Sequence, residues 1–371
     1  MSSESPTIRT LAAEAVARGA VDLSQGVVHA TPPKVLFDLF GKLSDDQLVN
    51  GYGPSQGDPL FLRAVLEIVQ GENKAVEQEN LLATIGVIGG IFSALESYCE
   101  PGDAVLMLEP CFPGYPWVVE AAGLKPVYVP HQKDGWGVDW VDFENKAKTA
   151  KAVLVASPGN PSGYLWKKDE LEKLLVVAAK YNLLVIADEI YDRFIWEGEF
   201  VSLMDEAIED SRIVVLRGFS KSLAMAGWRV GWAVATPDRI AAMQKVHDKV
   251  CPGGVSPLQR VVGMGWLEKA SELRAFTAKL TAQARMSRLA LADIFKKLGM
   301  EPIMPDGAIY MMVRHNRNDD MAAMRELLDK GVAVTPGRIF YGDGKKGTDF
   351  IRAHFALTDE DLRKVKERLL G

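Results

Sequence analysis

The feature that most constrains the fold is an alternation of short apolar runs with longer helical patterns. Amphipathic helical patterns over residues 87–98, 115–122 and 168–181 fall between several of the runs. The runs are continuous and rich in Val, Leu and Ile, as in strands buried on both faces: 81–85, 104–108, 126–129, 152–156, 183–187, 213–216 and 231–235. This succession predicts an α/β fold with a mostly parallel, seven-stranded sheet covered by helices.

A second, smaller unit is predicted after this sheet. A long helical stretch, residues 257–298, could bridge two domains. It is followed by an α+β pattern with strands at 308–313, 332–335 and 350–355 and helices at 321–330 and 359–370. A short helix is expected near the N-terminus, over residues 7–18.

We therefore expect three parts. Residues 1–35 form an N-terminal arm that packs with the small domain, residues 36–285 a large domain, and residues 286–371 a small C-terminal domain.

Composition excludes several classes of function. The net charge of the 371 residues is −6 and no block of like charge occurs, which argues against nucleic acid as the main partner. No apolar run approaches the roughly 20 residues of a membrane span, and the first twenty residues lack the apolar segment of a cleaved signal. Cys99, Cys111 and Cys251 lie far apart, which fits the reducing cytoplasm. The five histidines show no metal-ligand spacing, so no metal site is expected.

Ligands of open α/β sheets bind at the carboxyl ends of the strands, so the residues after each strand are the candidates for function. Gly86-Val87-Ile88 follows the first strand and opens a helix, where free backbone N–H groups attract a phosphate. The motif is neither GxGxxG nor a Walker sequence, and taken alone it is more simply explained by a tight strand-to-helix turn. Asn160, in a Pro- and Gly-rich turn, could cap that turn or donate to a ligand oxygen.

Charged residues follow the later strands. Burial of Asp188 and Glu189 after a buried strand is energetically costly unless a positive group lies beside them. Either residue could cap a helix N-terminus or form a salt bridge. Lys221 follows another buried strand, where desolvation could make its amine a nucleophile, although most lysines are solvated surface groups. Arg229 comes just before the next strand and could reach an anion held near Lys221.

In this order the motifs resemble the class I/II aminotransferases, pyridoxal-phosphate enzymes of fold type I. The resemblance runs from about residue 21 to the C-terminus and looks nearest to the glutamine/kynurenine aminotransferase branch. Its most specific pieces are Asn160-Pro-Ser-Gly, Asp188-Glu-Ile-Tyr191 and Phe219-Ser-Lys-Ser…Gly-Trp-Arg-Val-Gly231. Further support comes from Tyr52-Gly-Pro-Ser-Gln-Gly57, Glu109-Pro-Cys-Phe-Pro-Gly-Tyr115, Pro336-Gly337…Phe340 and Ile351-Arg352.

The resemblance implies roles for the residues that contact the cofactor ring. Lys221 resembles the lysine that holds pyridoxal phosphate as a Schiff base and, once released, moves the substrate proton. Asp188 resembles the acid that keeps the pyridine nitrogen protonated, so that the ring acts as an electron sink. Tyr191 and Asn160 resemble the donors to the phenolic oxygen, whose hydrogen bonds lower the basicity of the Schiff base, and Phe112 the aromatic that stacks on the ring.

The resemblance also implies which residues bind the cofactor phosphate and the substrate. Arg229, with the amides of Gly86, Val87 and Ile88, resembles the phosphate site. Tyr52 resembles a tyrosine that reaches the phosphate in a neighbouring subunit, which implies a homodimer with composite sites. Arg352 resembles the clamp for the substrate α-carboxylate, with the Gly26 backbone beside it.

Two departures concern the phosphate site and one the substrate pocket. Gly218 stands where many relatives have a serine, and Ile88 where many have a polar residue; Ser220 and Ser222 are expected to compensate. The segment Val27-Val28-His29-Ala30 follows Gly26, where relatives often carry an aromatic that shapes the pocket; His29 could face the substrate or have a capping or surface role.

The resemblance therefore implies transfer of an amino group between an L-amino acid and a 2-oxo acid by a ping-pong route. A pyridoxal-phosphate lyase that eliminates across a C–S bond is the alternative on the same fold. A non-catalytic regulatory module is disfavoured, because the segment before Val21 is too short for a winged helix.

Overall fold

The computed structural model describes residues 6–43, 47–132 and 136–371. Its large sheet has seven strands in the order β2-β8-β7-β6-β5-β3-β4. All seven predicted strands are confirmed, with ends that shift by at most two residues. The strands are β2 (Leu81–Ile85), β3 (Ala104–Glu109), β4 (Lys125–Pro130), β5 (Ala150–Ala156), β6 (Leu184–Asp188), β7 (Ile213–Gly218) and β8 (Val230–Val234).

The sheet is mostly parallel, as predicted. Only β8 runs against its neighbours β2 and β7, and the pairs from β7 to β4 are all parallel. The carboxyl ends of β5, β6 and β7 therefore meet at one edge of the sheet.

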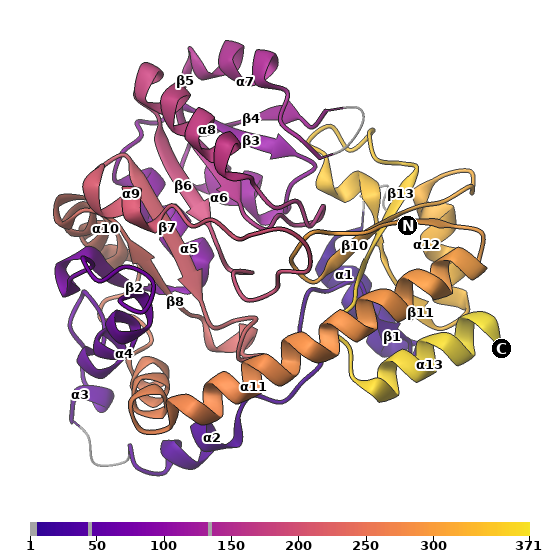
Figure 1. Ribbon diagram of the computed structural model, residues 1–371, viewed down its shortest axis with the longest axis horizontal. Coiled ribbons are helices and arrows are strands. Elements are labelled where there is room, and N and C mark those ends of the chain that lie inside the picture. Colours follow the sequence, from indigo (N-terminus) through magenta and orange to yellow (C-terminus); the bar gives the residue numbers. More distant parts are fainter. Residues whose placement is uncertain (1–5, 44–46, 133–135) are drawn as a thin grey trace.

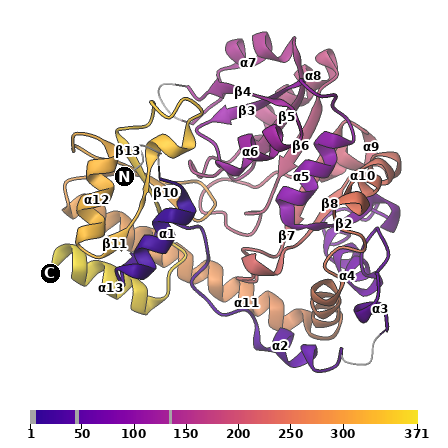
Figure 2. The ribbon, with the colours of Figure 1, turned by 180° about the vertical axis from the view of Figure 1, so that it is seen from behind.

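Helices cover both faces of this sheet (Figures 1 and 2). In β6, Leu184 and Ile186 enter the core on one face, whereas Val185 and Ala187 enter the core on the other. This double burial explains why the strand reads as a continuous apolar run. One face is covered by α5 (Gly86–Glu96), α6 (Gly114–Ala121) and α10 (Pro237–Val250), and the other by α4 (Pro59–Val69), α7 (Trp140–Ala147), α8 (Lys168–Tyr181) and α9 (Met204–Glu209).

The second unit contains two small sheets. One has four strands in the order β12-β13-β10-β9, and the other pairs β1 with β11. Their bounds are β1 (Val21–Asp22), β9 (Glu301–Ile303), β10 (Tyr310–Arg314), β11 (Val332–Ala333), β12 (Thr335–Pro336) and β13 (Phe350–His354). The single strand expected over 332–335 was wrong, because the chain breaks at Val334 and its two halves pair with different strands, β1 and β13.

The N-terminal residues lie against the C-terminal ones. Helix α1 (Ile8–Ala17) begins after Thr7, whose hydroxyl accepts from the Thr10 N–H, and it packs beside β1 and β11. Helices α12 (Asp320–Asp329) and α13 (Asp359–Leu370) complete this unit, and α1 and α13 lie on the same side of the molecule (Figure 1). The domain limits at residues 35 and 285 stay a prediction.

One long helix, α11 (Ser256–Lys297), connects the two units. Near its start it packs on α4, α2 (Lys34–Phe40) and α3 (Gln47–Asn50), and farther along it contacts β9 and α13. Its 42 residues bend at Lys269, which has non-helical φ and ψ. Beyond the bend, the Thr277 hydroxyl donates to the Ser222 carbonyl (3.0 Å), beside Lys221. None of the helices that the structure describes is long and apolar enough to cross a membrane.

Candidate active site

Lys221 lies where the two units meet. It is carried by the turn after β7, and its Nζ donates to the carbonyl oxygen of Gly26 at 2.5 Å. Gly26 belongs to the segment after β1, on the other unit. The lysine amine is therefore partly buried and faces the carboxyl ends of the central strands.

Asp188 ends β6 and is fully enclosed. The Tyr115 hydroxyl donates to its Oδ2 (2.7 Å), and the Ile190 N–H to its Oδ1 (3.0 Å). Burial raises the pKa of this carboxyl to about 6, while its two donors and the charge of Lys221 oppose that rise. No ion pair joins Asp188 to a cation of the described chain, so the charge of this buried acid has no close positive partner there.

Asn160 and Arg352 come together across 192 residues of sequence. Asn160 lies in the turn after β5, and its Oδ1 accepts from Nη1 of Arg352 at 2.8 Å. Arg352 is only 1% exposed, and its other terminal nitrogen donates to the Ser24 carbonyl. The guanidinium carbon lies 4.2 Å from the ring centre of Tyr310 and 4.7 Å from that of Phe340. Two aromatic faces thus fix the arginine plane.

Tyr191 contacts a residue that the sequence did not single out. Its hydroxyl lies 2.8 Å from the hydroxyl of Tyr310, on β10. Tyr310 also lies against Gly26, where an added Cβ would fall 1.7 Å from the phenolic oxygen. Gly26 is therefore required to be glycine for steric reasons. The only signal in the sequence was one tyrosine within the apolar run 308–313.

The residues expected to hold a phosphate converge at the start of α5. Arg229 has φ of +57° and its Nη1 donates to the Ala226 carbonyl (2.8 Å). Its other terminal nitrogen lies beside Gly86, where an added Cβ would fall 2.3 Å away. The N–H of Gly86 donates to the Arg229 carbonyl, which leaves Val87 and Ile88 in the first turn of the helix.

The glycine at position 218 has a steric explanation. A Cβ there would fall 2.9 Å from the Val230 carbonyl oxygen and 3.1 Å from the Gly231 Cα. Ser220 and Ser222 are both buried beside it. Residue 218 therefore has no space for a side chain, and a phosphate role for the two serines stays a prediction.

The remaining predicted residues, Phe112, Tyr52 and His29, differ in burial and in contacts. Phe112 is partly buried, with its ring 5.5 Å from that of Tyr115 in an edge-to-face contact. Tyr52 is 89% exposed, so it makes little contact with its own chain. His29 is tied to Asp361 of α13 (Nδ1 to Oδ2, 2.9 Å) and packs edge-to-face on His354 at 4.8 Å.

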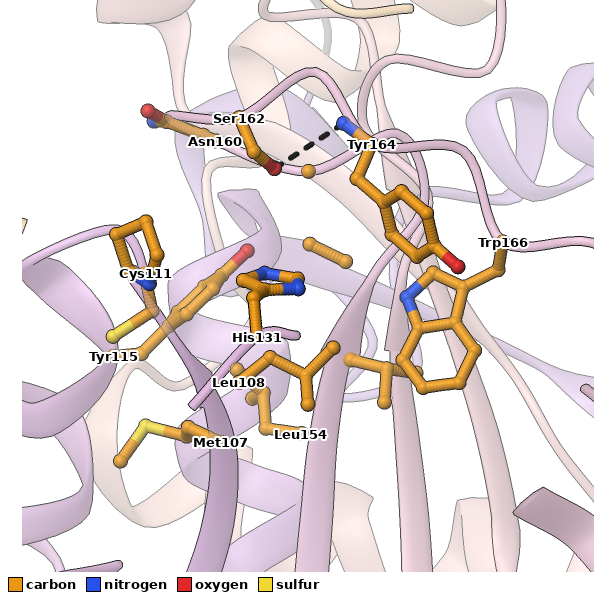
Figure 3. Close-up of a pocket in the computed structure, with 14 residues that line it drawn as sticks. Met107, Leu108, Cys111, Tyr115, His131, Leu154, Asn160, Ser162, Tyr164 and Trp166 are labelled. Carbon is orange, nitrogen blue, oxygen red and sulfur yellow. Dashed lines mark hydrogen bonds between the residues drawn. The ribbon is translucent and has the colours of Figure 1, made fainter. Parts of the chain in front are cut away.

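A small cavity lies behind Asn160 (Figure 3). Tyr115, His131, Asn160, Ser162 and Tyr164 contribute polar atoms to its wall. Its volume of about 30 Å³ suffices for about one or two water molecules. Burial lowers the pKa of His131 to about 4, so this wall carries no positive charge at neutral pH. The cavity is too small for a substrate.

Glu189 faces away from Lys221 and closes a separate ion cluster. Arg217, 1% exposed, donates through Nε to Glu189 (2.9 Å), through Nη1 to Glu72 (2.7 Å) and through Nη2 to Ser202 (2.9 Å). Asp192 lies 3.7 Å from the same guanidinium. The salt-bridge interpretation of Glu189 is therefore the one that the structure supports.

The site therefore combines four groups. They are the amine of Lys221, the buried acid Asp188, Arg229 at the N-terminus of α5 and the buried Arg352 near Asn160. This constellation suits pyridoxal phosphate, which offers an aldehyde, a basic ring nitrogen and a phosphate. Fold and site thus define a pyridoxal-phosphate enzyme of fold type I.

Comparison with known proteins gives the family. The profile described as aminotransferase class I and II matches residues 18–369, so the chain belongs to this family. An aspartate/prephenate aminotransferase of Thermus thermophilus is 31% identical over 324 residues, 85% of this chain and 82% of the relative. A probable kynurenine–oxoglutarate transaminase of Saccharomyces cerevisiae is 27% identical, with 95% and 86% covered.

Solved structures agree. Aspartate aminotransferase from Thermus thermophilus with maleate superposes with a TM-score of 0.88 at 27% identity, over 98% of this chain and 96% of that chain. N-succinyldiaminopimelate aminotransferase from Mycobacterium tuberculosis gives 0.89 at 25% identity, again over 98% and 96%. The chain is a pyridoxal-phosphate-dependent aminotransferase.

Proposed function

We propose that Lys221 binds the cofactor covalently through its amine and then moves the substrate proton. The observation that carries this proposal is the position of that amine, between Gly26 on one unit and the strand ends that bear Asp188 and Asn160. When bound, pyridoxal phosphate supplies an electron sink for the bond that breaks at the substrate Cα. Once an incoming amino acid releases it, Lys221 is placed to take the proton from that carbon and return it to the cofactor side.

Asp188 serves the ring nitrogen in this proposal. Its carboxylate keeps two hydrogen bonds that fix its orientation, and it has no ion pair of its own among the described residues. A protonated ring nitrogen would meet the buried charge and lower the pKa of Asp188 again. Each group thus keeps the other ionised.

Arg352 and Asn160 orient the substrate. Arg352 is held between two rings and by Asn160 before any ligand arrives, and a planar guanidinium pairs with a carboxylate through two parallel hydrogen bonds. Arg352 therefore binds the α-carboxylate, which both an amino acid and a 2-oxo acid carry. One site can then accept the two substrates in turn, as a ping-pong exchange requires.

The phosphate end lies at Arg229 and the first turn of α5. The backbone amides of Val87 and Ile88 and the positive end of the helix dipole favour an anion there, whereas the predicted Gly86 amide already donates to the Arg229 carbonyl. Ser220 and Ser222 add hydroxyl donors close by, and Phe112 covers the ring from the side of α6.

The proposed enzyme is a cytoplasmic homodimer. Tyr52 is almost fully exposed on one chain, which fits a side chain that completes the phosphate site of a second copy. Cys99, Cys111 and Cys251 are all free thiols, as expected in a reducing compartment.

Lys221→Ala tests the proposal. We expect the protein to fold, to lose the near-ultraviolet and visible absorbance of the lysine-bound cofactor, and to lose turnover by at least about a thousandfold. The wild-type protein should convert its cofactor to the amine form when mixed with amino acids. Release of pyruvate and ammonia without that conversion would identify a lyase, and normal turnover by Lys221→Ala would refute the assignment.

A further inference from the structure

Two buried phenols meet at the centre of the site. The hydroxyls of Tyr191 and Tyr310 lie 2.8 Å apart, and the two side chains are 5% and 2% exposed. Their rings meet edge-to-face, with centres 5.7 Å apart at 82°. Each oxygen thus has a hydrogen-bond partner, and either one can be the donor.

A count of protons shows that this pair is incomplete. Each phenol has one proton, and the bond between the two oxygens uses only one of them. Within residues 6–43, 47–132 and 136–371, neither hydroxyl has a second hydrogen-bond partner. The other proton therefore points to no acceptor of the described protein. A buried donor without an acceptor is costly, so the pair is built to meet an acceptor from a ligand.

The surroundings decide which tyrosine meets that ligand. Tyr310 is enclosed, because its hydroxyl lies against Gly26 and its ring against the Arg352 guanidinium at 4.2 Å. The ring of Tyr191 instead lies 5.7 Å from the Lys221 amine, where the cofactor is joined. An acceptor atom on a cofactor that is joined to Lys221 would therefore meet Tyr191 rather than Tyr310.

Other ionisable groups surround the pair. Asp188 lies on β6, Lys221 on the turn after β7, and Arg352 and His354 on β13, where His354 is directly opposite Tyr310. Burial raises the pKa of Tyr191 well above its ordinary value; Tyr310 and Asp188 add to the rise, and Arg352 opposes it. Tyr191 is therefore a neutral donor at physiological pH.

We propose that Tyr310 is a positioning residue which donates to Tyr191, so that the single Tyr191 proton is directed at the phenolic oxygen of the cofactor. The proposal rests on the function proposed above. If Tyr191 gave its proton to Tyr310, it would have none for the cofactor, and the Tyr310 proton would remain without an acceptor. Only the order Tyr310, Tyr191, cofactor oxygen satisfies every donor.

This order has a spectroscopic consequence. A hydrogen bond to the phenolic oxygen lowers the basicity of the nitrogen that joins Lys221 to the cofactor. Without the Tyr310 hydroxyl, Tyr191 can turn its proton away, and the nitrogen becomes more basic. We expect Tyr310→Phe to raise the midpoint of the absorbance titration of the bound cofactor by about one pH unit, the size of one hydrogen bond.

The experiment is a set of absorbance titrations of the cofactor-loaded enzyme. Tyr191→Phe should raise the midpoint at least as far as Tyr310→Phe, and the double variant no further than Tyr191→Phe alone, because Tyr310 acts through Tyr191. Phe340→Leu is the matched control: it removes the other aromatic face on Arg352 but no hydroxyl, and should leave the midpoint in place. Circular dichroism of each variant checks that the fold is retained.

Two results would overturn the proposal while the proposed function stands. One is a normal cofactor band with an unshifted midpoint in Tyr310→Phe. The other is full additivity of the two tyrosine substitutions. If wild-type protein formed no lysine-dependent band at all, the proposed function and this proposal would both fail.

Discussion

Asp188 and Glu189 are neighbours in sequence, both carboxylates and both buried, yet the chain treats them differently. Glu189 meets Arg217 at 2.9 Å and accepts further hydrogen bonds from Ser202 and the Leu203 N–H. Among the residues that the structure describes, Asp188 receives only two donors, both neutral, from Tyr115 and Ile190. The side chain of Glu189 completes a closed ion cluster, whereas that of Asp188 faces Lys221.

The difference separates stability from function at the end of one strand. The cluster around Arg217 joins β6, β7 and the segment after α4, and it is satisfied by the protein itself. The negative charge of Asp188, by contrast, has no ion-pair partner among the described residues. A group that needs a ligand to be satisfied costs stability without it and provides affinity with it.

The largest effect is expected from breaking the ion cluster around Arg217, and it is an effect on stability. Arg217→Met would leave Glu189, Glu72 and Asp192 without their shared buried cation, and should lower the free energy of unfolding by about 3–5 kcal/mol. Chemical denaturation of the purified variant measures this. Arg193→Met is the control, since Arg193 is 44% exposed and pairs with the same Glu72 and Asp192, and its loss should cost at most about 1 kcal/mol. Equal losses in the two variants would contradict the comparison.

The second largest effect is expected on catalysis, from a change at Asp188. Asp188→Asn removes the charge that faces the ring nitrogen and leaves one acceptor oxygen, which can serve either the Tyr115 hydroxyl or the Ile190 N–H. We expect kcat to fall by roughly 100- to 1000-fold, as for the loss of a preorganised electrostatic group. Steady-state kinetics with a saturating amino acid measures it. Glu189→Gln should instead lower stability more than turnover, and the reverse ranking would show that the two carboxylates had been assigned to the wrong tasks.

The smallest effect is the stability of the cofactor-free protein as a function of pH. Burial raises the pKa of Asp188 to about 6, above its ordinary value of about 4, so the folded state holds this proton more tightly than the unfolded state. The favourable contribution is complete below about pH 4 and is lost as pH rises through about 6. Cofactor-free Asp188→Asn should therefore match wild type near pH 3 and exceed it by roughly 2–3 kcal/mol at pH 8. Thermal melts at the two pH values test this, and an equal difference at both would exclude Asp188 as the cause.

The sequence predicted the central sheet well because its strands are buried on both faces and so read as unbroken apolar runs. It was less informative where burial is one-sided or pairing is short. Helix α10 was missed although Thr236 and Pro237 mark its start, and β1 has only two residues. The break at Val334 could not be read from sequence, since it depends on which strands, β1 or β13, lie beside each half.

Within the site, the sequence singled out residues with distinctive chemistry, such as Lys221, Asp188 and Arg229. It missed Tyr310, because a tyrosine inside an apolar strand has the appearance of a core residue. Its importance comes from contacts with Tyr191, 119 residues away, and with Gly26, which only the tertiary structure brings together.

The long helix α11 suggests how the two units could move without disturbing the lysine. Thr277 fastens the helix to the Ser222 carbonyl beyond the bend at Lys269. From that hydrogen bond to Lys297 the helix extends about 30 Å, given a rise of 1.5 Å per residue. Thr277 lies near the start of the segment beyond the bend, so rotation of that segment about this hydrogen bond would displace its far end, with β9 and α13, farther than the lysine. Lys221 would then sit at the pivot, where displacement is least.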